Sequence, residues 1–321
     1  MNKPKTLIGD CFFSSQYGKW ESLRESHNIL KHIKTRNLII DNNTITVQFN
    51  PRRTVSTCAS VDKHSIEQRP CFLCMSNKPA EQDFIRFSIN EPFILRVNPY
   101  PILPKHLTIS SERHQPQLLA DKTHLQIPGL LITWLEQHFE KGYALFYNGA
   151  VCGASAPDHF HFQAVLQTDV PFIRQWDRLM QSAIKIQEKK LPDKSICTEY
   201  EISNYLCPIR AFITNQSYIT DSTLITQYLD LLPLHENENE PRYNLFAWID
   251  PNRGFSTAYF PRKKHRPDCY SDEGSKKHLI SPGALDMGGL IVTIRQEDFE
   301  SISKNDIIQI FNEVSYKSAF M

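Results

Sequence analysis

The chain has 321 residues, of which 40% are hydrophobic and 22% are charged, and its formal net charge is +1 at pH 7. A chain of this length can bury a sizeable core and is typical of about two structural units. The near-neutral charge excludes the general basic footprint of nucleic-acid-binding and membrane-surface proteins, but it is compatible with a local site for a small anion. We therefore expect a globular protein without nucleic-acid or membrane partners.

The start of the chain and its cysteines indicate a cytoplasmic location. The first residues, MNKPKTLIGDCFFSS, lack the apolar stretch of a signal peptide. No apolar run approaches the roughly 20 residues that span a bilayer. Only Cys71 and Cys74 of the eight cysteines are close together, so the pattern does not resemble a disulfide framework.

Helices and strands alternate along the first part of the chain. Apolar residues recur at three- and four-residue steps over residues 126–141, which predicts the clearest helix, and Gly142 is well placed to end it. A glycine-containing loop at residues 148–158 connects two strands. The other elements expected here are a helix near 17–34 and strands at 37–41, 44–49, 92–97, 106–110, 143–147 and 159–166.

The second part is expected to begin with a helix at about residues 171–190. The acidic stretch HENENE at 235–240 is the best candidate for a boundary. Strands are expected at 243–249, 255–260 and 288–294, followed by a helix near 304–316. Alternating helices, strands and hairpin-like turns favour an α+β fold of two similar-sized units.

The run His159-Phe160-His161-Phe162-Gln163 carries the strongest chemical signal. Side chains alternate across a strand, so the two phenylalanines would face the core while the histidines and Gln163 share the other face. Imidazole is a nucleophile near neutral pH, and its phosphoramidate can pass a group on. Gln163 could donate a hydrogen bond to a phosphate oxygen in the transition state. The alternative interpretation is a polar edge strand with surface histidines.

The segment NGAVCGASAPDHFHFQ resembles the active-site segment of the histidine-triad superfamily. The most similar branch contains galactose-1-phosphate uridylyltransferase, diadenosine tetraphosphate phosphorylase and GDP-L-galactose phosphorylase, which carry His-x-His-x-Gln. The resemblance implies that His161 is the nucleophile and that Ser155 and Gln163 contact the transferred phosphate. In the uridylyltransferase pattern two residues separate the serine from the first histidine, whereas three do so here, which leaves the role of Ser155 less secure.

Further segments extend this resemblance to about residues 44–165 and 242–302. They are FNPRR, RVNPYPILPKHLTIS, YNLFAWIDPNRGFSTAYFPRKKH and PGALDMGGLIVTIRQEDFESI. The implied fold is α+β, with two histidine-triad-like halves that each contain an antiparallel sheet and flanking helices. We expect a catalytic half at residues 1–170, a helical connection at 171–240, and a second half at 241–321 that lacks the catalytic motif.

The pair Cys71-Phe72-Leu73-Cys74 has the spacing of a zinc chelate, although a lone CxxC is only half a site. The alternatives are two buried free thiols or a redox pair. The resemblance to the uridylyltransferase implies that His114 and His159 complete the site. Four such ligands would form a closed structural zinc site that also holds the catalytic strand.

Several further residues are candidates for substrate binding. Small residues such as Gly153 let backbone N–H groups approach an anion. Guanidinium groups can donate two hydrogen bonds to phosphate oxygens. Arginines and lysines on loops are, however, often simply exposed to solvent. The candidates are Arg52, Arg53, Asn98, Asn148, Gly153 and, from the basic run 262–266, Lys263 and Lys264.

The expected reaction is nucleotidyl transfer through a nucleotidyl-His161 intermediate. The donor would be a nucleoside diphosphate sugar or a dinucleoside polyphosphate. With phosphate as acceptor the enzyme is a phosphorylase, which we favour; with a sugar phosphate it is a uridylyltransferase-like enzyme. A nucleotide hydrolase and a non-catalytic nucleotide- or zinc-binding protein are weaker alternatives. The sequence does not determine the oligomeric state and is compatible with a homodimer.

Overall fold

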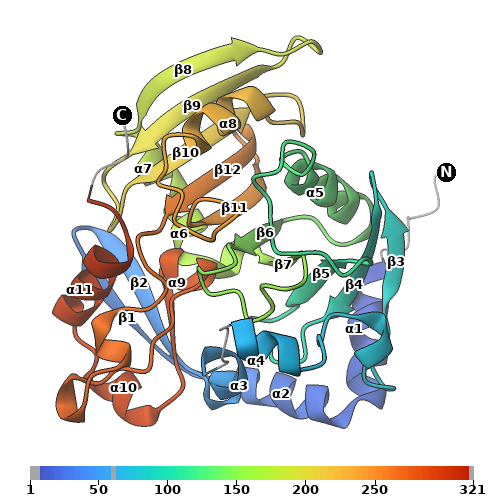
Figure 1. The fold of residues 1–321 in the computed structure, drawn as a ribbon, viewed down its shortest axis with the longest axis vertical. Coiled ribbons are helices and arrows are strands. Elements are labelled where there is room, and N and C mark those ends of the chain that lie inside the picture. Colours follow the sequence, from blue (N-terminus) through green and yellow to red (C-terminus); the bar gives the residue numbers. More distant parts are fainter. Residues whose placement is uncertain (1–7, 59–62, 318–321) are drawn as a thin grey trace.

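Runs of aromatic, leucine and β-branched residues form the middle of one large antiparallel sheet (Figure 1). The computed structural model describes residues 8–58 and 63–317. The sheet has ten strands in the order β3-β4-β5-β7-β6-β11-β12-β10-β9-β8. Their bounds are β3 Ile85–Ser88, β4 Pro92–Val97, β5 Leu107–Ser111, β6 Tyr143–Asn148, β7 His161–Leu166, β8 Ile184–Lys190, β9 Ile196–Ile202, β10 Ile209–Thr214, β11 Tyr243–Asp250 and β12 Gly254–Pro261.

A smaller sheet and short helices surround the large sheet. The smaller sheet has the order β1-β2-β13, in which β13 is parallel to β2. Its strands are β1 Lys34–Ile40, β2 Asn43–Phe49 and β13 Leu290–Thr293. The α-helices are α1 Ile8–Lys19, α2 Glu21–Lys31, α3 Thr54–Thr57, α4 Lys63–Gln68, α5 Ile127–His138, α6 Pro171–Arg174, α7 Trp176–Met180, α8 Ser222–Leu229, α9 Ala284–Met287, α10 Gln296–Ser301 and α11 Lys304–Val314.

The large sheet consists of two five-stranded halves with the same strand order. From its outer edge inwards the first half reads β3-β4-β5-β7-β6, and the second reads β8-β9-β10-β12-β11. Each half carries one longer helix after its third strand, α5 in the first and α8 in the second. The halves meet where β6 pairs with β11. The structure therefore has the expected α+β class, and its two halves agree with the pair of similar halves that the family resemblance implies.

The expected helix at residues 171–190 is wrong over its second part. Only α6 and α7 are helical, and residues 184–190 form the edge strand β8. Every residue of β8 is exposed. The strand therefore has no buried face, and the alternation of buried and exposed side chains that usually identifies a strand is missing. The boundaries at 170 and 240 stay a prediction, but the strand order favours residues 184–261 as the second half of the sheet.

Two hydrophobic cores cover opposite faces of the large sheet. Along β11, Leu245 and Ala247 belong to one core and Phe246 and Trp248 to the other, as the alternation of side chains requires. The first core includes residues of α1, α5 and α8, and the second includes residues of α6, α9, α11 and the smaller sheet. Among the described residues, no helix has the length and apolarity to cross a lipid bilayer.

The motif of residues 159–163 lies at the start of β7, the fourth strand of the first half counted from the outer edge. Phe160 and Phe162 are fully buried in the first core, as the sequence predicts. The strand itself begins at His161 rather than at His159, because residues 159 and 160 bond to the loops around Ala156 and Gln115. Helix α5 ends at His138, so Gly142 lies in the link to β6 and not at the helix end.

Candidate active site

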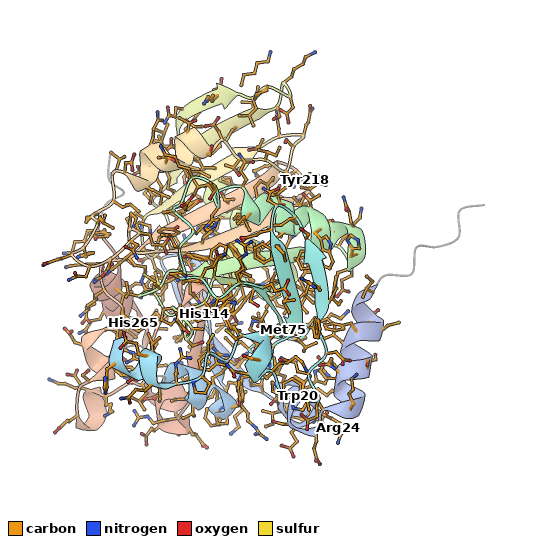
Figure 2. The ribbon with its side chains drawn as sticks, turned by 45° about the vertical axis from the view of Figure 1, so that its right-hand side comes forward. Trp20, Arg24, Met75, His114, Tyr218 and His265 are labelled. Atoms are coloured by element: carbon orange, nitrogen blue, oxygen red, sulfur yellow. The ribbon has the colours of Figure 1, made fainter. Side chains whose placement is uncertain are left out.

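A cavity of about 490 Å³ opens on the face of β7 opposite the two phenylalanines. Its walls come from the first half of the sheet, the loops after β4 and β6, Arg53 and the segment 65–82 that runs from α4 towards β3. Trp20 also lines it; this residue lies between α1 and α2 and is labelled near the lower edge of Figure 2. The cavity brings together seven residues that the sequence predicts to act on the substrate. These are Arg53, Asn98, Asn148, Gly153, Ser155, His161 and Gln163.

His161 is held as a neutral imidazole with one nitrogen free. Its Nδ1 lies 2.8 Å from the backbone oxygen of His159, so Nδ1–H donates to that carbonyl and Nε2 keeps its lone pair. The side chain is only 5% exposed. Burial lowers the pKa of His161 to about 4, while the bond to the His159 backbone partly opposes this shift. At neutral pH the imidazole is therefore uncharged and available for nucleophilic attack.

The amide of Gln163 is oriented by two neighbours. His106 Nδ1 accepts a hydrogen bond from the backbone N–H of Ile102 at 3.1 Å, so its Nε2 carries the proton. That nitrogen lies 2.9 Å from Gln163 Oε1, which also accepts from Asn98 Nδ2 at 3.2 Å. With its oxygen engaged, Gln163 presents its NH₂ group as a donor to the cavity.

His106 and Gln117 are functional neighbours that the sequence reasoning missed. His106 is 1% exposed, and burial lowers its pKa to about 3, with Arg53 as a second cause. Gln117 Oε1 accepts from the His161 backbone N–H at 2.8 Å, and its Nε2 donates to the His161 and Asn148 carbonyls. Both act through contacts between distant segments, for which the sequence holds no local signal.

The loop from Asn148 to Asp158 is shaped by close contacts. Gly153 has φ +94°, and an added Cβ would come within 2.6 Å of the Gly283 Cα, so only glycine fits there. Arg69 donates to the Ser155 carbonyl at 3.2 Å and to Asp158 at 3.0 Å. This arginine accommodates the additional residue before His159 and leaves Ser155 at the cavity wall.

Asn98 and Asn148 both line the cavity, but their oxygens already have partners. Asn98 Oδ1 accepts from the Tyr100 backbone N–H at 2.9 Å. Asn148 Oδ1 accepts from the Ala284 N–H at 2.7 Å and from Asn244 at 3.0 Å. Asn98 Nδ2 also donates to Thr108 Oγ1 at 3.1 Å and to Gln163 Oε1 at 3.2 Å, so Asn98 organises the site wall. The NH₂ group of Asn148 is the one that this pair can offer to a ligand.

The basic candidates separate clearly in space. Arg53 lines the cavity and donates to the Tyr100 carbonyl at 2.9 Å, whereas Arg52 pairs with Glu25 on the surface. Lys263 is exposed and Lys264 pairs with Asp268 and Glu313. These three residues lie outside the cavity, so their expected role in substrate binding is not supported by their positions.

The four predicted metal ligands converge beside the nucleophile. The ligand atoms of Cys71, Cys74, His114 and His159 all lie within 4.8 Å of one another. Cys71 Sγ and Cys74 Sγ lie 3.4 Å and 3.7 Å from His159 Nδ1, and Cys74 Sγ lies 3.3 Å from His114 Nδ1. Tetrahedral zinc with usual bond lengths separates S and N ligands by about 3.5 Å. The cluster therefore has the ligand set and spacing of a metal site.

Comparison with known proteins agrees with this geometry. A family model described as a domain of unknown function, DUF4922, matches residues 12–166. Protein APA1 of Saccharomyces cerevisiae (strain ATCC 204508 / S288c) is 32% identical over 246 residues, which cover 72% of this chain and 70% of the relative. The chain belongs to the protein APA1 family. The resemblance to this branch of the histidine-triad superfamily is thereby confirmed.

Solved structures confirm the fold of this APA1 family member. The crystal structure of yeast Ap4A phosphorylase Apa2 in complex with Ap4A has a TM-score of 0.59 and 14% sequence identity, and the match covers 95% of this chain and 97% of that chain. The complex of the same enzyme with AMP has a TM-score of 0.55 and 14% identity, with 92% and 97% covered. The α+β architecture is therefore shared along nearly the whole chain.

Proposed function

We propose that this chain is a phosphorylase of dinucleoside polyphosphates that works through a nucleotidyl-His161 intermediate. The observation that carries the proposal is the environment of His161, a buried neutral imidazole whose Nδ1–H is held by the His159 carbonyl while Nε2 is free. Family membership supports nucleotidyl transfer as the reaction class. Because yeast Apa2 is an Ap4A phosphorylase and has been crystallised in complex with Ap4A, this dinucleotide is the first substrate to test.

The large cavity suits a nucleoside with its α-phosphate at β7. Trp20, Phe72 and Tyr100 supply aromatic surface in the cavity lining, which suits a base and ribose. His161, Gln163 and Ser155 form the polar end of the same cavity. A nucleoside bound along this axis would bring its α-phosphorus to His161 Nε2.

The proposed reaction consists of two displacements at phosphorus. His161 Nε2 first forms a bond to the α-phosphorus of Ap4A, and the bond to the bridging oxygen breaks and releases ATP. A phosphate oxygen then attacks the same phosphorus, which releases ADP and restores the imidazole. The Nδ1 proton stays on the imidazole, bonded to the His159 carbonyl, throughout. Gln163 NH₂ would stabilise the charge on the non-bridging oxygens.

The cysteine–histidine cluster is proposed to hold a structural zinc ion. His159 Nε2 lies 2.8 Å from the Ser111 carbonyl, which fixes Nδ1 as the nitrogen with the lone pair facing Cys71 and Cys74. Two thiolates and two imidazoles suit zinc and leave no open position. The ion would contribute rigidity to residue 159 and hence to the carbonyl that orients His161.

Incubation with Ap4A and isotopically labelled inorganic phosphate tests the proposed function. The expected products are labelled ADP and unlabelled ATP. Release of AMP without phosphate incorporation would instead indicate a hydrolase. Turnover only with a nucleoside diphosphate sugar and a hexose 1-phosphate would indicate the uridylyltransferase-like alternative. Nucleotide binding without turnover would indicate a non-catalytic protein.

A further inference from the structure

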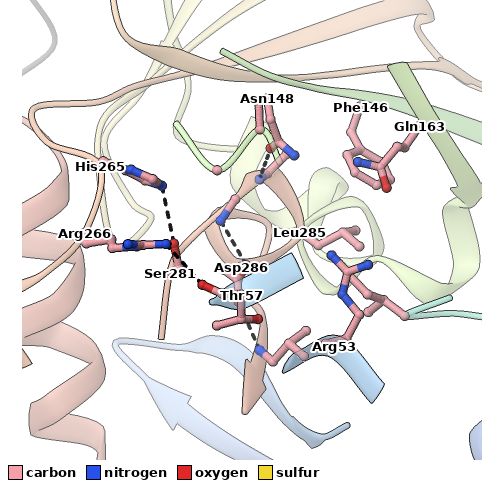
Figure 3. Close-up of a pocket in the computed structure, with 16 residues that line it drawn as sticks. Arg53, Thr57, Phe146, Asn148, Gln163, His265, Arg266, Ser281, Leu285 and Asp286 are labelled. Atoms are coloured by element: carbon pink, nitrogen blue, oxygen red, sulfur yellow. Dashed lines mark hydrogen bonds between the residues drawn. The ribbon is translucent and has the colours of Figure 1, made fainter. Parts of the chain in front are cut away.

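A second, smaller cavity lies behind Gln163 and Gly153, on the side where the C-terminal segments pack (Figure 3). Its volume is about 50 Å³. One water molecule needs about 10–15 Å³ on this measure, so the space suits a group of a few heavy atoms such as one phosphate. Four residues line both this cavity and the large one: Arg53, Asn148, Gly153 and Gln163.

The part of the wall that only the small cavity has includes a polar group formed by residues 265, 266 and 281 together with Thr57. Arg266 Nε donates to Ser281 Oγ at 3.0 Å, and Arg266 NH2 donates to the Thr57 carbonyl at 3.2 Å. His265 Nε2 lies 3.4 Å from the same serine oxygen. Figure 3 shows His265 and Arg266 converging on Ser281, across the cavity from Arg53. A basic group therefore stands on each side of the small space.

Positive charge near this cavity exceeds negative charge in the part of the chain that the structure describes. Arg53 and Arg262 have no carboxylate within ion-pair distance there, although both interact electrostatically with Asp286. Arg262 is fully buried and bonded to carbonyls and Asn244. Asp286 is the one carboxylate that the described residues place in the cavity wall, and its oxygens accept from the backbone N–H groups of residues 283 and 292. A buried excess of cations is costly unless an anion compensates it.

We infer that this small cavity is the subsite for the acceptor phosphate, and that His265, Arg266 and Ser281, in the segment that follows β12, are binding residues for it. The inference rests on the proposed function and deepens it. Arg53 and Gln163 lie at the junction of the two cavities, so an anion in the small one would face a nucleotidyl group on His161. The leaving ATP would place its first phosphate in the same position before the acceptor arrives.

The chemistry of this step is balanced without a further reactant. One oxygen of the bound phosphate forms a bond to the nucleotidyl phosphorus while the P–Nε2 bond to His161 breaks. The electron pair returns to the imidazole, and the nucleoside diphosphate leaves. Arg53 and Arg266 would lower the repulsion between the two phosphates.

Discharge of the isolated intermediate tests this inference separately from the proposed function. The nucleotidyl-enzyme is prepared with Ap4A in the absence of phosphate, separated from nucleotides, and mixed with increasing inorganic phosphate. Loss of one charge-assisted contact in Arg266→Gln is expected to raise the half-saturating phosphate concentration by about 10- to 100-fold. Ser281→Ala, which removes the hydroxyl that Arg266 contacts, should raise it by a smaller factor.

Two controls make the outcome decisive. Lys276→Ala changes an exposed lysine outside both cavities and should leave the phosphate dependence unchanged. The rate at which the intermediate loses its nucleotide to water should also stay the same in Arg266→Gln and Ser281→Ala. If the intermediates of both variants are discharged with the same half-saturating phosphate concentration as that of the wild type, the assignment of the acceptor subsite is wrong. Failure to form any intermediate would instead contradict the proposed function.

Discussion

His161 Nδ1 lies 2.8 Å from the backbone carbonyl oxygen of His159, whose own Nδ1 faces the sulfur atoms of Cys71 and Cys74. One residue thus contributes its side chain to the metal cluster and its carbonyl to the nucleophile. The carbonyl decides which imidazole nitrogen carries the proton and points Nε2 at the cavity. The proposed metal site and the orientation of the proposed nucleophile therefore share residue 159.

Removal of the proposed zinc should therefore affect both stability and catalysis. Treatment with a strong chelator is expected to lower the thermal unfolding midpoint and to slow formation of the nucleotidyl intermediate, and Cys71→Ser should do the same without chelator. Elemental analysis should find one zinc per wild-type chain. Cys11→Ser changes an exposed cysteine far from the cluster in sequence and serves as the control. A metal-free wild-type protein with full activity would contradict this prediction.

Gln163→Ala should reduce the rate of intermediate formation by about 10²- to 10³-fold, because it removes a donor from the developing charge. His106→Ala should cost about tenfold, since Gln163 Oε1 would keep only its bond to Asn98. Single-turnover rates with saturating Ap4A separate this loss from weaker substrate binding. His106→Gln keeps a donor near Gln163 and should recover part of the rate. Equal rates for all three variants and the wild type would exclude a positioning role for His106.

Arg53 and Arg52 form a matched pair for substitution. Arg53 lines both cavities, and Arg53→Ala should raise KM for Ap4A by about tenfold or more through loss of a charged contact. Arg52 pairs with Glu25 at the surface, so Arg52→Ala should change KM by less than about twofold. Steady-state kinetics of the two variants provide the comparison. A larger effect of Arg52→Ala would mean that the wrong arginine has been assigned to the substrate.

The buried His106 should make stability depend on pH. Burial and Arg53 lower its pKa to about 3 in the folded chain, against about 6.5 when unfolded. Between these values the unfolded chain binds a proton that the folded chain does not, so stability is complete above pH 6.5 and falls as the pH drops. From pH 7 to pH 5 this amounts to about 2 kcal/mol of unfolding free energy.

Urea unfolding of the wild type and of His106→Gln at pH 7 and pH 5 isolates this contribution. The wild type should lose more stability on acidification than the variant, by up to the stated amount. Asp286 acts in the opposite direction in both proteins, because burial raises its pKa to about 6. An equal loss in the two proteins would mean that His106 is not held neutral in the folded state.

The sequence was sufficient to predict those parts of the site that follow from local patterns. The alternation of phenylalanine with histidine correctly predicted which face of β7 meets the core. The CxxC required the family resemblance to supply His114 and His159, which the structure brings to it. The sequence also offered Asn98 and Asn148 as substrate-binding candidates, but it did not indicate that their oxygens are already bonded.

Other features depend on contacts between distant segments and could not be predicted in this way. His106 meets Gln163 across two strands, 57 residues apart in the chain. In the basic run, the residues predicted from the sequence were Lys263 and Lys264, which lie outside the small cavity. The residues that line this cavity are the next two in the chain, His265 and Arg266. β8 is exposed along its whole length, and its pairing with β9 makes it a strand. The repeated strand order is likewise a property of the assembled sheet.

The most direct test of the central claim is intact-protein mass spectrometry after incubation with Ap4A in the absence of phosphate. The account predicts an added mass of one AMP residue on the wild-type chain, its removal on addition of phosphate, and no adduct on His161→Ala although that variant still binds the nucleotide. An adduct of the same mass on His161→Ala, or phosphorolysis by the wild type without any adduct, would contradict the assignment of His161 as the nucleophile.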